Sequence, residues 1–198
     1  MSNVLALVLL VVPRAAPSTQ ADTIAFSKSY DLERSGDYKG AIAALETVSR
    51  KQTYLTEFRL GWLHYLSGDH VTARRHYQAA MRASPKAIEP RLGYILPCLA
   101  MNRYDEVEAM ARTIVGMDPN HYTGGLRLAY ALRMQRKYRP ARDVLAGMLL
   151  LYPTDVSLLS EQMMNAYNLQ STELPELCER ILAIDPKNAL AWQYLPIK

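Results

Sequence analysis

The residues of this 198-residue chain that could perform metal or acid–base chemistry are four histidines and two cysteines. In chain order they are His64, His70, His76, Cys98, His121 and Cys178. No two histidines have the His-Glu-x-x-His spacing and no cysteine lies close to them in sequence, so zinc-ligand patterns are missing. His70 follows Asp69 and could imitate part of a catalytic triad. It falls at a predicted turn between helices, which favours a structural role.

Phosphate-binding and hydrolase motifs are also missing. Gly124-Gly125 precedes Leu126 without the Lys-Ser/Thr that a phosphate-binding loop requires. The nucleophile elbow Gly-x-Ser-x-Gly does not occur. We therefore expect no enzymatic activity, no cofactor and no metal, and we look for function in binding surfaces.

Composition predicts a folded chain without a strong global charge. Hydrophobic residues make up 49% of the sequence and the formal net charge is +4, so no overall field drives binding to nucleic acid. Charge is nevertheless uneven. A predicted hairpin turn is basic through Arg127, Arg133, Arg136, Lys137, Arg139 and Arg142, and the segment after it is acidic through Glu161, Glu173, Glu176 and Glu179. The basic turn could meet phosphate groups or an acidic partner, or it could be a solvated face balanced by its acidic neighbour.

The first 21 residues are typical of an export signal. Val4 to Val12 is an unbroken apolar run, too short for the roughly 20 residues of a membrane span, and Thr19-Gln20-Ala21 allows cleavage before Asp22. No Lys or Arg precedes the run, which weakens the prediction. The alternatives are a hydrophobic helix packed on the folded domain, a misassigned start or a short anchor. We therefore expect a periplasmic or secreted protein, with a cytoplasmic location as the alternative.

From Asp22 onward the sequence repeats. Pro85, Pro119 and Pro153 follow one another at intervals of 34 residues, and Pro186 follows after 33. Each stands where a helix should end, because proline lacks an N–H group and clashes with the preceding turn. Small and apolar positions keep the same interval: Ala73, Val107 and Ala141 form one column, and Tyr77, Ala111 and Leu145 form another. An earlier, irregular repeat has its turn at Gly36-Asp37, 32 residues before Gly68-Asp69.

This pattern resembles the tetratricopeptide repeat, whose residues run Trp, Leu-Gly, Tyr, Ala, Phe, Pro over about 34 residues. Leu60-Gly61, Ala73, Tyr77 and Pro85 carry the resemblance. Glu57 stands where the pattern has Trp and His64 where it has Tyr, which are departures. The resemblance implies an all-α, right-handed superhelical solenoid of antiparallel helix pairs over residues 22–198. About five repeats and a C-terminal capping helix are expected.

The period also predicts the individual helices and the state of the cysteines. The first-helix and second-helix ranges expected are 23–35 with 38–51, 54–67 with 71–83, 88–101 with 104–116, 122–135 with 138–151, and 156–169 with 174–184, followed by a helix from 188. Pro97 falls inside one of them, where Gly93, four residues earlier, should ease the clash and give a kink rather than a break. Cys98 and Cys178 lie two repeats apart, so we expect both to be buried and unbridged.

The first helix of each repeat has two apolar directions. Leu60 and Gly61 share one, whereas Phe58, Trp62 and Tyr65 share another about 120° away, at about 100° per residue. In the family that it resembles, the second direction faces a concave groove that binds peptides or helices. Steps of 34 give three columns: Phe58, Leu92, Leu126 and Ser160; Trp62, Leu96, Tyr130 and Met164; Tyr65, Leu99, Arg133 and Tyr167. The candidate partner-binding residues are Phe26, Tyr30, Phe58, Trp62, Tyr65, Leu92, Leu96, Tyr130, Arg133 and Tyr167.

These columns predict a non-enzymatic scaffold that binds an apolar or amphipathic segment of a partner protein. The family's carboxylate clamp is absent, because Phe58, Trp62, Leu92 and Leu96 occupy its columns. If the protein is exported, envelope assembly, secretion or polysaccharide export are the expected settings. The alternatives are an intracellular adaptor or regulator, or an accessory subunit of an enzyme complex. Burial of these columns as ordinary core, and self-association of the solenoid, remain open.

Overall fold

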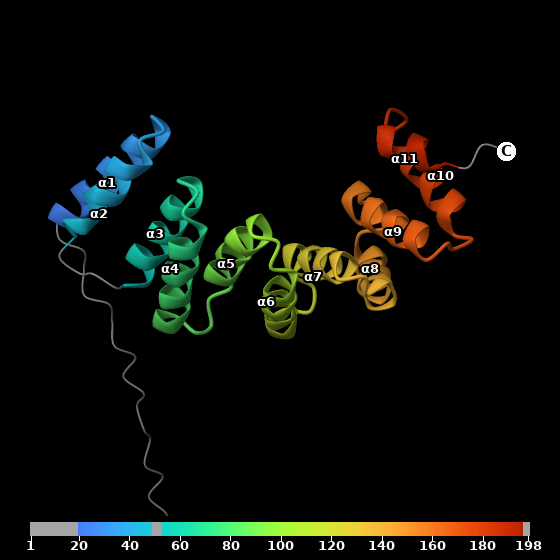
Figure 1. Ribbon diagram of the computed structural model, residues 1–198, viewed down its shortest axis with the longest axis horizontal. Coiled ribbons are helices and arrows are strands. Elements are labelled where there is room, and N and C mark those ends of the chain that lie inside the picture. The colour runs from blue at the N-terminus through green and yellow to red at the C-terminus, as the bar shows by residue number, and fades with distance from the viewer. Residues whose placement is uncertain (1–19, 49–52, 196–198) are drawn as a thin grey trace, which may run out of the picture. The chain divides into compact units, whose positions relative to one another are not determined.

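Helices account for the regular secondary structure of residues 20–48 and 53–195, which are the residues that the computed structural model describes (Figure 1). The elements are α1 (Gln20–Arg34), α2 (Tyr38–Glu46), α3 (Tyr54–Leu66), α4 (His70–Ala83), α5 (Glu89–Ala100), α6 (Tyr104–Met117), α7 (Tyr122–Met134), α8 (Tyr138–Leu151), α9 (Val156–Asn168), α10 (Leu174–Ile184) and α11 (Ala189–Tyr194). The predicted all-α solenoid of helix pairs is therefore confirmed. The expected signal segment lies almost entirely outside the described residues, and its cleavage point before Asp22 falls in the first turn of α1.

The chain divides into two compact units. The first comprises residues 1–49 and contains the hairpin of α1 and α2. The second comprises residues 50–198 and contains α3 to α11. Within the second unit, each helix packs on the next one along the chain, and α3 also contacts α5, α7 contacts α9 and α9 contacts α11. In the described part of the chain, no helix is both long and apolar enough to pass through a membrane.

The turns inside the hairpins follow one design. Each contains one residue in the left-handed region, with φ between 52° and 83°. Gly36, Gly68, Asn102 and Arg136 lie two residues before the second helix, and Gln170 lies four residues before α10. In the first four turns, the next residue is the N-cap of the second helix. The Asp37 and Asp69 carboxylates accept hydrogen bonds from the N–H groups of Gly40 and Thr72. These caps satisfy backbone groups that the helix itself leaves unpaired.

The predicted small columns form the core. Ala73, Val107 and Ala141 are fully buried, as are Ala111 and Leu145. Cys98 and Cys178 are both free and buried, as predicted, and burial raises the pKa of the Cys98 thiol to about 11. A buried cysteine of this kind acts as a small apolar side chain.

The Tyr77 ring connects α3, α4 and α5. A Cβ atom at Gly61 would lie 2.9 Å from this ring, and one at Gly93 would lie 2.2 Å from it. Gly93 therefore makes room for Tyr77, a role that the sequence did not indicate. Pro97 does not break α5, which continues from Glu89 to Ala100.

Candidate partner-binding groove

One cavity lies between the first helices of successive repeats, and we call it the proximal cavity. It has a volume of about 290 Å³. Phe58 and Trp62 of α3 line it together with residues of α5 and α7, namely Glu89, Leu92, Gly93, Ile95, Leu96, Thr123 and Arg127, and with Tyr77 of α4. Its wall is mostly apolar. Only Glu89 and Arg127 bring charges to it.

A second cavity, the distal cavity, lies between α7 and α9. Its volume is about 380 Å³, and its lining is Leu126, Arg127, Tyr130, Val156, Ser157, Ser160 and Glu161. Arg127 lines both cavities, so the two adjoin across α7. We call them together the groove.

The first predicted column and three of the four members of the second lie in this groove, whereas Met164 packs against a core cluster. Phe58, Leu92, Leu126 and Ser160 all line it, as do Trp62, Leu96 and Tyr130. Phe58 and Leu92 also pack against the buried core, so each is part core and part groove wall. Tyr130 is half-buried, with the ring of Tyr104 at 6.1 Å.

The third column lies apart from both cavities. Tyr65 and Leu99 pack against the core. Arg133 donates hydrogen bonds to both carboxylate oxygens of Glu161, with Nε–Oε2 at 2.8 Å and Nη2–Oε1 at 3.2 Å. Its guanidinium carbon lies 5.2 Å from the centre of the Tyr130 ring. Burial would lower the pKa of Arg133, but the hydrogen bond and charge of Glu161 outweigh it and raise that pKa. Tyr167 is 50% exposed and contacts Tyr194 edge-on.

The remaining two candidates lie in the first unit. Phe26 is half-buried on α1, and 48% of Tyr30 is exposed. Tyr30 has a further interaction within the chain. Their place on a partner-binding surface stays a prediction.

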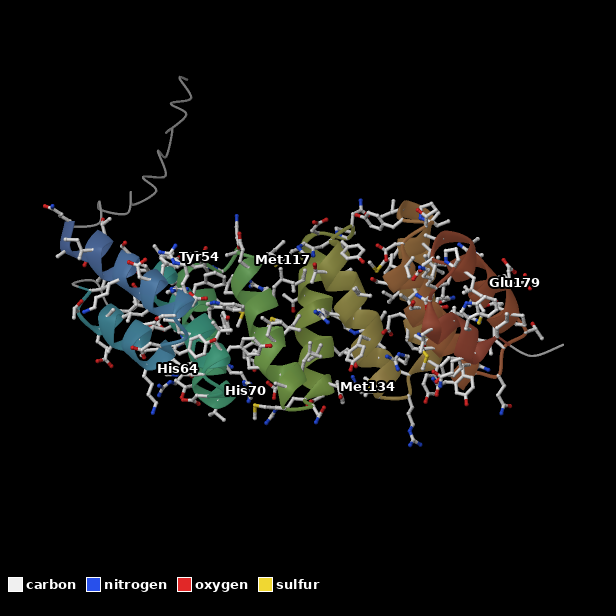
Figure 2. All side chains as sticks on the ribbon, turned by 90° about the horizontal axis from the view of Figure 1, so that it is seen from above. Tyr54, His64, His70, Met117, Met134 and Glu179 are labelled. Carbon is white, nitrogen blue, oxygen red and sulfur yellow. The ribbon has the colours of Figure 1, made fainter. Side chains whose placement is uncertain are left out.

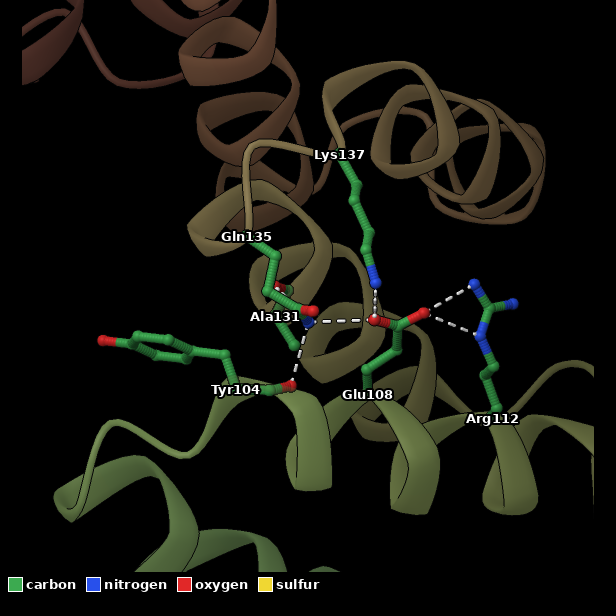
Figure 3. A network of polar contacts seen from close by, with 6 residues as sticks. All are labelled: Tyr104, Glu108, Arg112, Ala131, Gln135 and Lys137. Atoms are coloured by element: carbon green, nitrogen blue, oxygen red, sulfur yellow. Dashed lines mark hydrogen bonds and ion pairs between the residues drawn. The ribbon is translucent and has the colours of Figure 1, made fainter.

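The basic hairpin turn is balanced in part by acidic side chains. Lys137 Nζ lies 2.7 Å from Glu108 Oε2 of α6 (Figure 3). The Gln135 amide donates to the same carboxylate at 2.9 Å and to the Tyr104 carbonyl at 3.0 Å, and Arg112 binds its other oxygen. Together with the Arg133–Glu161 pair, these contacts use two of the six basic side chains for packing between repeats.

A polar cluster that the sequence did not predict joins α3 and α4. Glu57 stands at the Trp position of the repeat, is 6% exposed and contacts His76 Nδ1 at 2.7 Å. His64 stacks on His76 with ring centres 5.1 Å apart and lies 3.4 Å from Asp69. Burial, followed by the nearby His76, lowers the pKa of His64. His64 and His70 lie at the same end of this hairpin (Figure 2).

Within residues 20–48 and 53–195, no group of three or more His, Cys, Asp or Glu side chains is arranged to hold a metal ion. In the polar cluster, Glu57 and His64 stand where the repeat pattern has Trp and Tyr. Their contacts with His76 and Asp69 take the place of aromatic packing there.

The fold and the groove define a class, namely a helical-repeat protein built from stacked hairpins. Residues 26–88 match the tetratricopeptide repeat family model. This match covers the first repeats of the chain and agrees with the resemblance that the sequence indicated. Proteins of this family are generally non-catalytic scaffolds for protein–protein interaction.

Solved structures of the same fold resemble the chain at low sequence identity. A tetratricopeptide repeat protein from Parabacteroides merdae superposes with a TM-score of 0.81 at 15% identity, over 88% of this chain and 71% of that one. MamA superposes with a TM-score of 0.75 at 13% identity, over 90% of this chain and 98% of that one. YrrB is described as a repeat protein with an unusual peptide-binding site. It superposes with a TM-score of 0.74 at 11% identity, over 87% of this chain and 90% of that one. A search of curated protein sequences finds no match.

Proposed function

We propose that the second unit is a scaffold that binds an apolar or amphipathic segment of a partner protein in the groove. The observation that carries this proposal is the shared lining of the two cavities. Seven residues of two predicted columns line these cavities: Phe58, Trp62, Leu92, Leu96, Leu126, Tyr130 and Ser160. They recur at the interval of the repeat, and none of them is fully buried.

The groove has the composition of a recognition surface. Trp62, Phe58 and Tyr130 are large rings that bury much area with little loss of side-chain entropy, and such residues dominate binding energy at interfaces. The backbone around them is fixed by helices on both sides. A segment that enters the groove would therefore meet a wall that is already formed, which limits the ordering cost of binding.

One structure of the same fold is consistent with this proposal. YrrB is described as having a peptide-binding site, although its identity to this chain is 11%. That resemblance establishes the fold alone, so the residues that bind have to come from this chain's own groove.

The test compares a groove variant with an exposed-aromatic variant. Trp62→Ala combined with Tyr130→Ala should abolish the capture of partner proteins, identified by mass spectrometry, while helix content and melting temperature stay close to those of the native protein. Trp192→Ala is the control, because Trp192 is 57% exposed on α11 and lies outside both cavities. Unchanged capture by the double variant would refute the groove. A large loss of stability would show that the two rings are core.

We also propose export to the periplasm or beyond the cell, which the apolar run of residues 4–12 supports. The partner would then be a protein of envelope assembly, secretion or polysaccharide export. The N-terminal residue of the mature chain should lie near Asp22, and N-terminal sequencing of native protein that finds Met1 instead would rule out this cleavage.

A further inference from the structure

Arg127 occupies the junction of the groove. It lies on α7 and lines both cavities, with Thr123 beside it in the proximal cavity and Leu126 and Tyr130 beside it in the distal cavity. Thr123 and Arg127 are separated by one helical turn, as are Leu126 and Tyr130, so neighbouring faces of one helix form the two walls. A segment that passes from one cavity to the other must cross the Arg127 side chain.

The charge of Arg127 is not balanced within the described part of the chain. The side chain is half-buried, and it forms no hydrogen bond or ion pair among residues 20–48 and 53–195. The other charged residues of the groove do have partners. Glu161 binds Arg133 in the distal cavity, and Glu89 accepts a hydrogen bond from the Tyr54 hydroxyl at 3.4 Å in the proximal cavity.

Docking of a purely apolar segment over this guanidinium would remove its bound water and provide no hydrogen-bond acceptor to replace it. A charge that loses its hydration without gaining a partner lowers the affinity of the complex, whereas a carboxylate can accept two parallel hydrogen bonds from the guanidinium fork. The arrangement therefore rejects segments without an acid as well as favouring those that carry one.

We propose that Arg127 is a specificity-determining residue that takes an Asp or Glu side chain from the docked segment. This inference rests on the proposed function of the groove. The partner is then an apolar or amphipathic segment with one internal acidic residue, flanked on both sides by apolar residues that fill the two cavities. A C-terminal carboxylate fits less well, because a chain that ends at Arg127 would leave one cavity unfilled.

The proposal can be tested with a displayed library of 12-residue peptides selected on the purified full chain. Peptides that bind the native protein should be enriched in Asp or Glu between apolar residues. Replacing that acid by Gln or Asn in a synthetic, C-terminally amidated peptide should weaken binding roughly ten- to hundredfold, as measured by fluorescence anisotropy. Binding that requires a free C-terminus instead of the internal acid would overturn the assignment.

Protein variants separate this inference from the proposed function. Arg127→Gln should remove the preference for the acid, and Arg127→Glu should select Lys or Arg at the same place. Arg139→Glu makes the same change in net charge on an exposed side chain outside both cavities, and it should keep the native preference. If native protein and Arg127→Gln select the same peptides, the inference is wrong although the groove still binds. If Trp62→Ala with Tyr130→Ala also selects those peptides, the groove itself is refuted and this inference falls with it.

Discussion

Close packing at single atoms sets the spacing of the helices around Tyr77. Its ring lies against the backbone of α3 at Gly61 and of α5 at Gly93, so that two helices contact one side chain of α4. Since Tyr77 is 1% exposed, the ring has no direction in which to retreat. Interiors packed at this density respond to the addition of one methyl group.

Gly93→Ala should therefore destabilise the protein by about 1–3 kcal/mol, because the new Cβ would lie 2.2 Å from the Tyr77 ring. Gly147→Ala is the matched control. Gly147 lies inside α8, and an added Cβ there would meet nothing within 4 Å, so the better helix propensity of alanine should stabilise the protein by up to about 1 kcal/mol. Urea unfolding of both variants measures these changes. Equal effects would show that Tyr77 does not constrain α5.

The residue types that repeat could be predicted from the sequence, but the contacts between side chains could not. Columns at 34 residues identified the buried Ala73 and Ala141 and the groove residues Trp62 and Tyr130. Arg127 appeared only as one of six basic residues, because its position between two cavities depends on the distance between α7 and its neighbouring helices. The pairing of Glu57 with His76 likewise depends on how α3 and α4 are rotated about their axes.

At the scale of elements, each turn within a hairpin has one residue in the left-handed region, but the residue type differs. The left-handed position holds Gly36 and Gly68 in the first two hairpins and Asn102, Arg136 and Gln170 in the next three. A side chain with a Cβ atom costs about 1–2 kcal/mol in this region, less for Asn. The last three hairpins therefore contain this backbone strain. Their stability must come from packing between repeats, such as the contacts of Lys137 and Gln135 with Glu108.

Arg136→Gly should stabilise the protein by about 1 kcal/mol, because glycine adopts a φ of 61° without strain. Arg136→Ala is the control: it removes the same charge and keeps the Cβ atom, so it should bring no comparable gain. Thermal unfolding at fixed pH compares the two. A gain in Arg136→Ala equal to that in Arg136→Gly would assign the effect to charge within the basic turn and not to the backbone.

Helix boundaries were predicted closely where proline or turn residues mark them and less well elsewhere. The structure places α8 at Tyr138–Leu151 and α10 at Leu174–Ile184, as the period predicts. By contrast, α2 ends at Glu46 instead of extending to residue 51, and no proline marks this end in the sequence. The sequence indicated Gly93 as the residue that eases the clash with Pro97, but it did not indicate the packing of Gly93 against the Tyr77 ring.

For the second unit as a whole, stability depends on contacts between neighbours along the chain. Glu106 of α6 binds Arg74 of α4, accepts a hydrogen bond from the Tyr94 hydroxyl of α5 and pairs with Arg103, so one carboxylate joins three helices. In a linear array of repeats, loss of one such junction weakens the coupling between the parts on either side of it. Its effect should therefore be largest in the helices next to it.

Glu106→Gln should lower the free energy of unfolding by about 1–3 kcal/mol at neutral pH, because Arg74 and Arg103 lose a charged partner. Burial alone would raise the pKa of Glu106, but the Tyr94 hydrogen bond and the two arginines outweigh it and hold that pKa below its ordinary value of 4.5. The contribution of Glu106 is thus complete above this value and is lost as the pH falls through the lower pKa of the folded state.

The difference between the native protein and Glu106→Gln should therefore shrink as the pH is lowered below about 4, which urea unfolding at a series of pH values measures. Hydrogen exchange should show lost protection in α4, α5 and α6 and little change in α9 to α11, since coupling passes only between neighbours. Glu176→Gln on the exposed face of α10 is the control and should change neither measurement. A uniform loss of protection from α3 to α11 would show that the second unit unfolds as one cooperative body, without the graded coupling that its neighbour contacts imply.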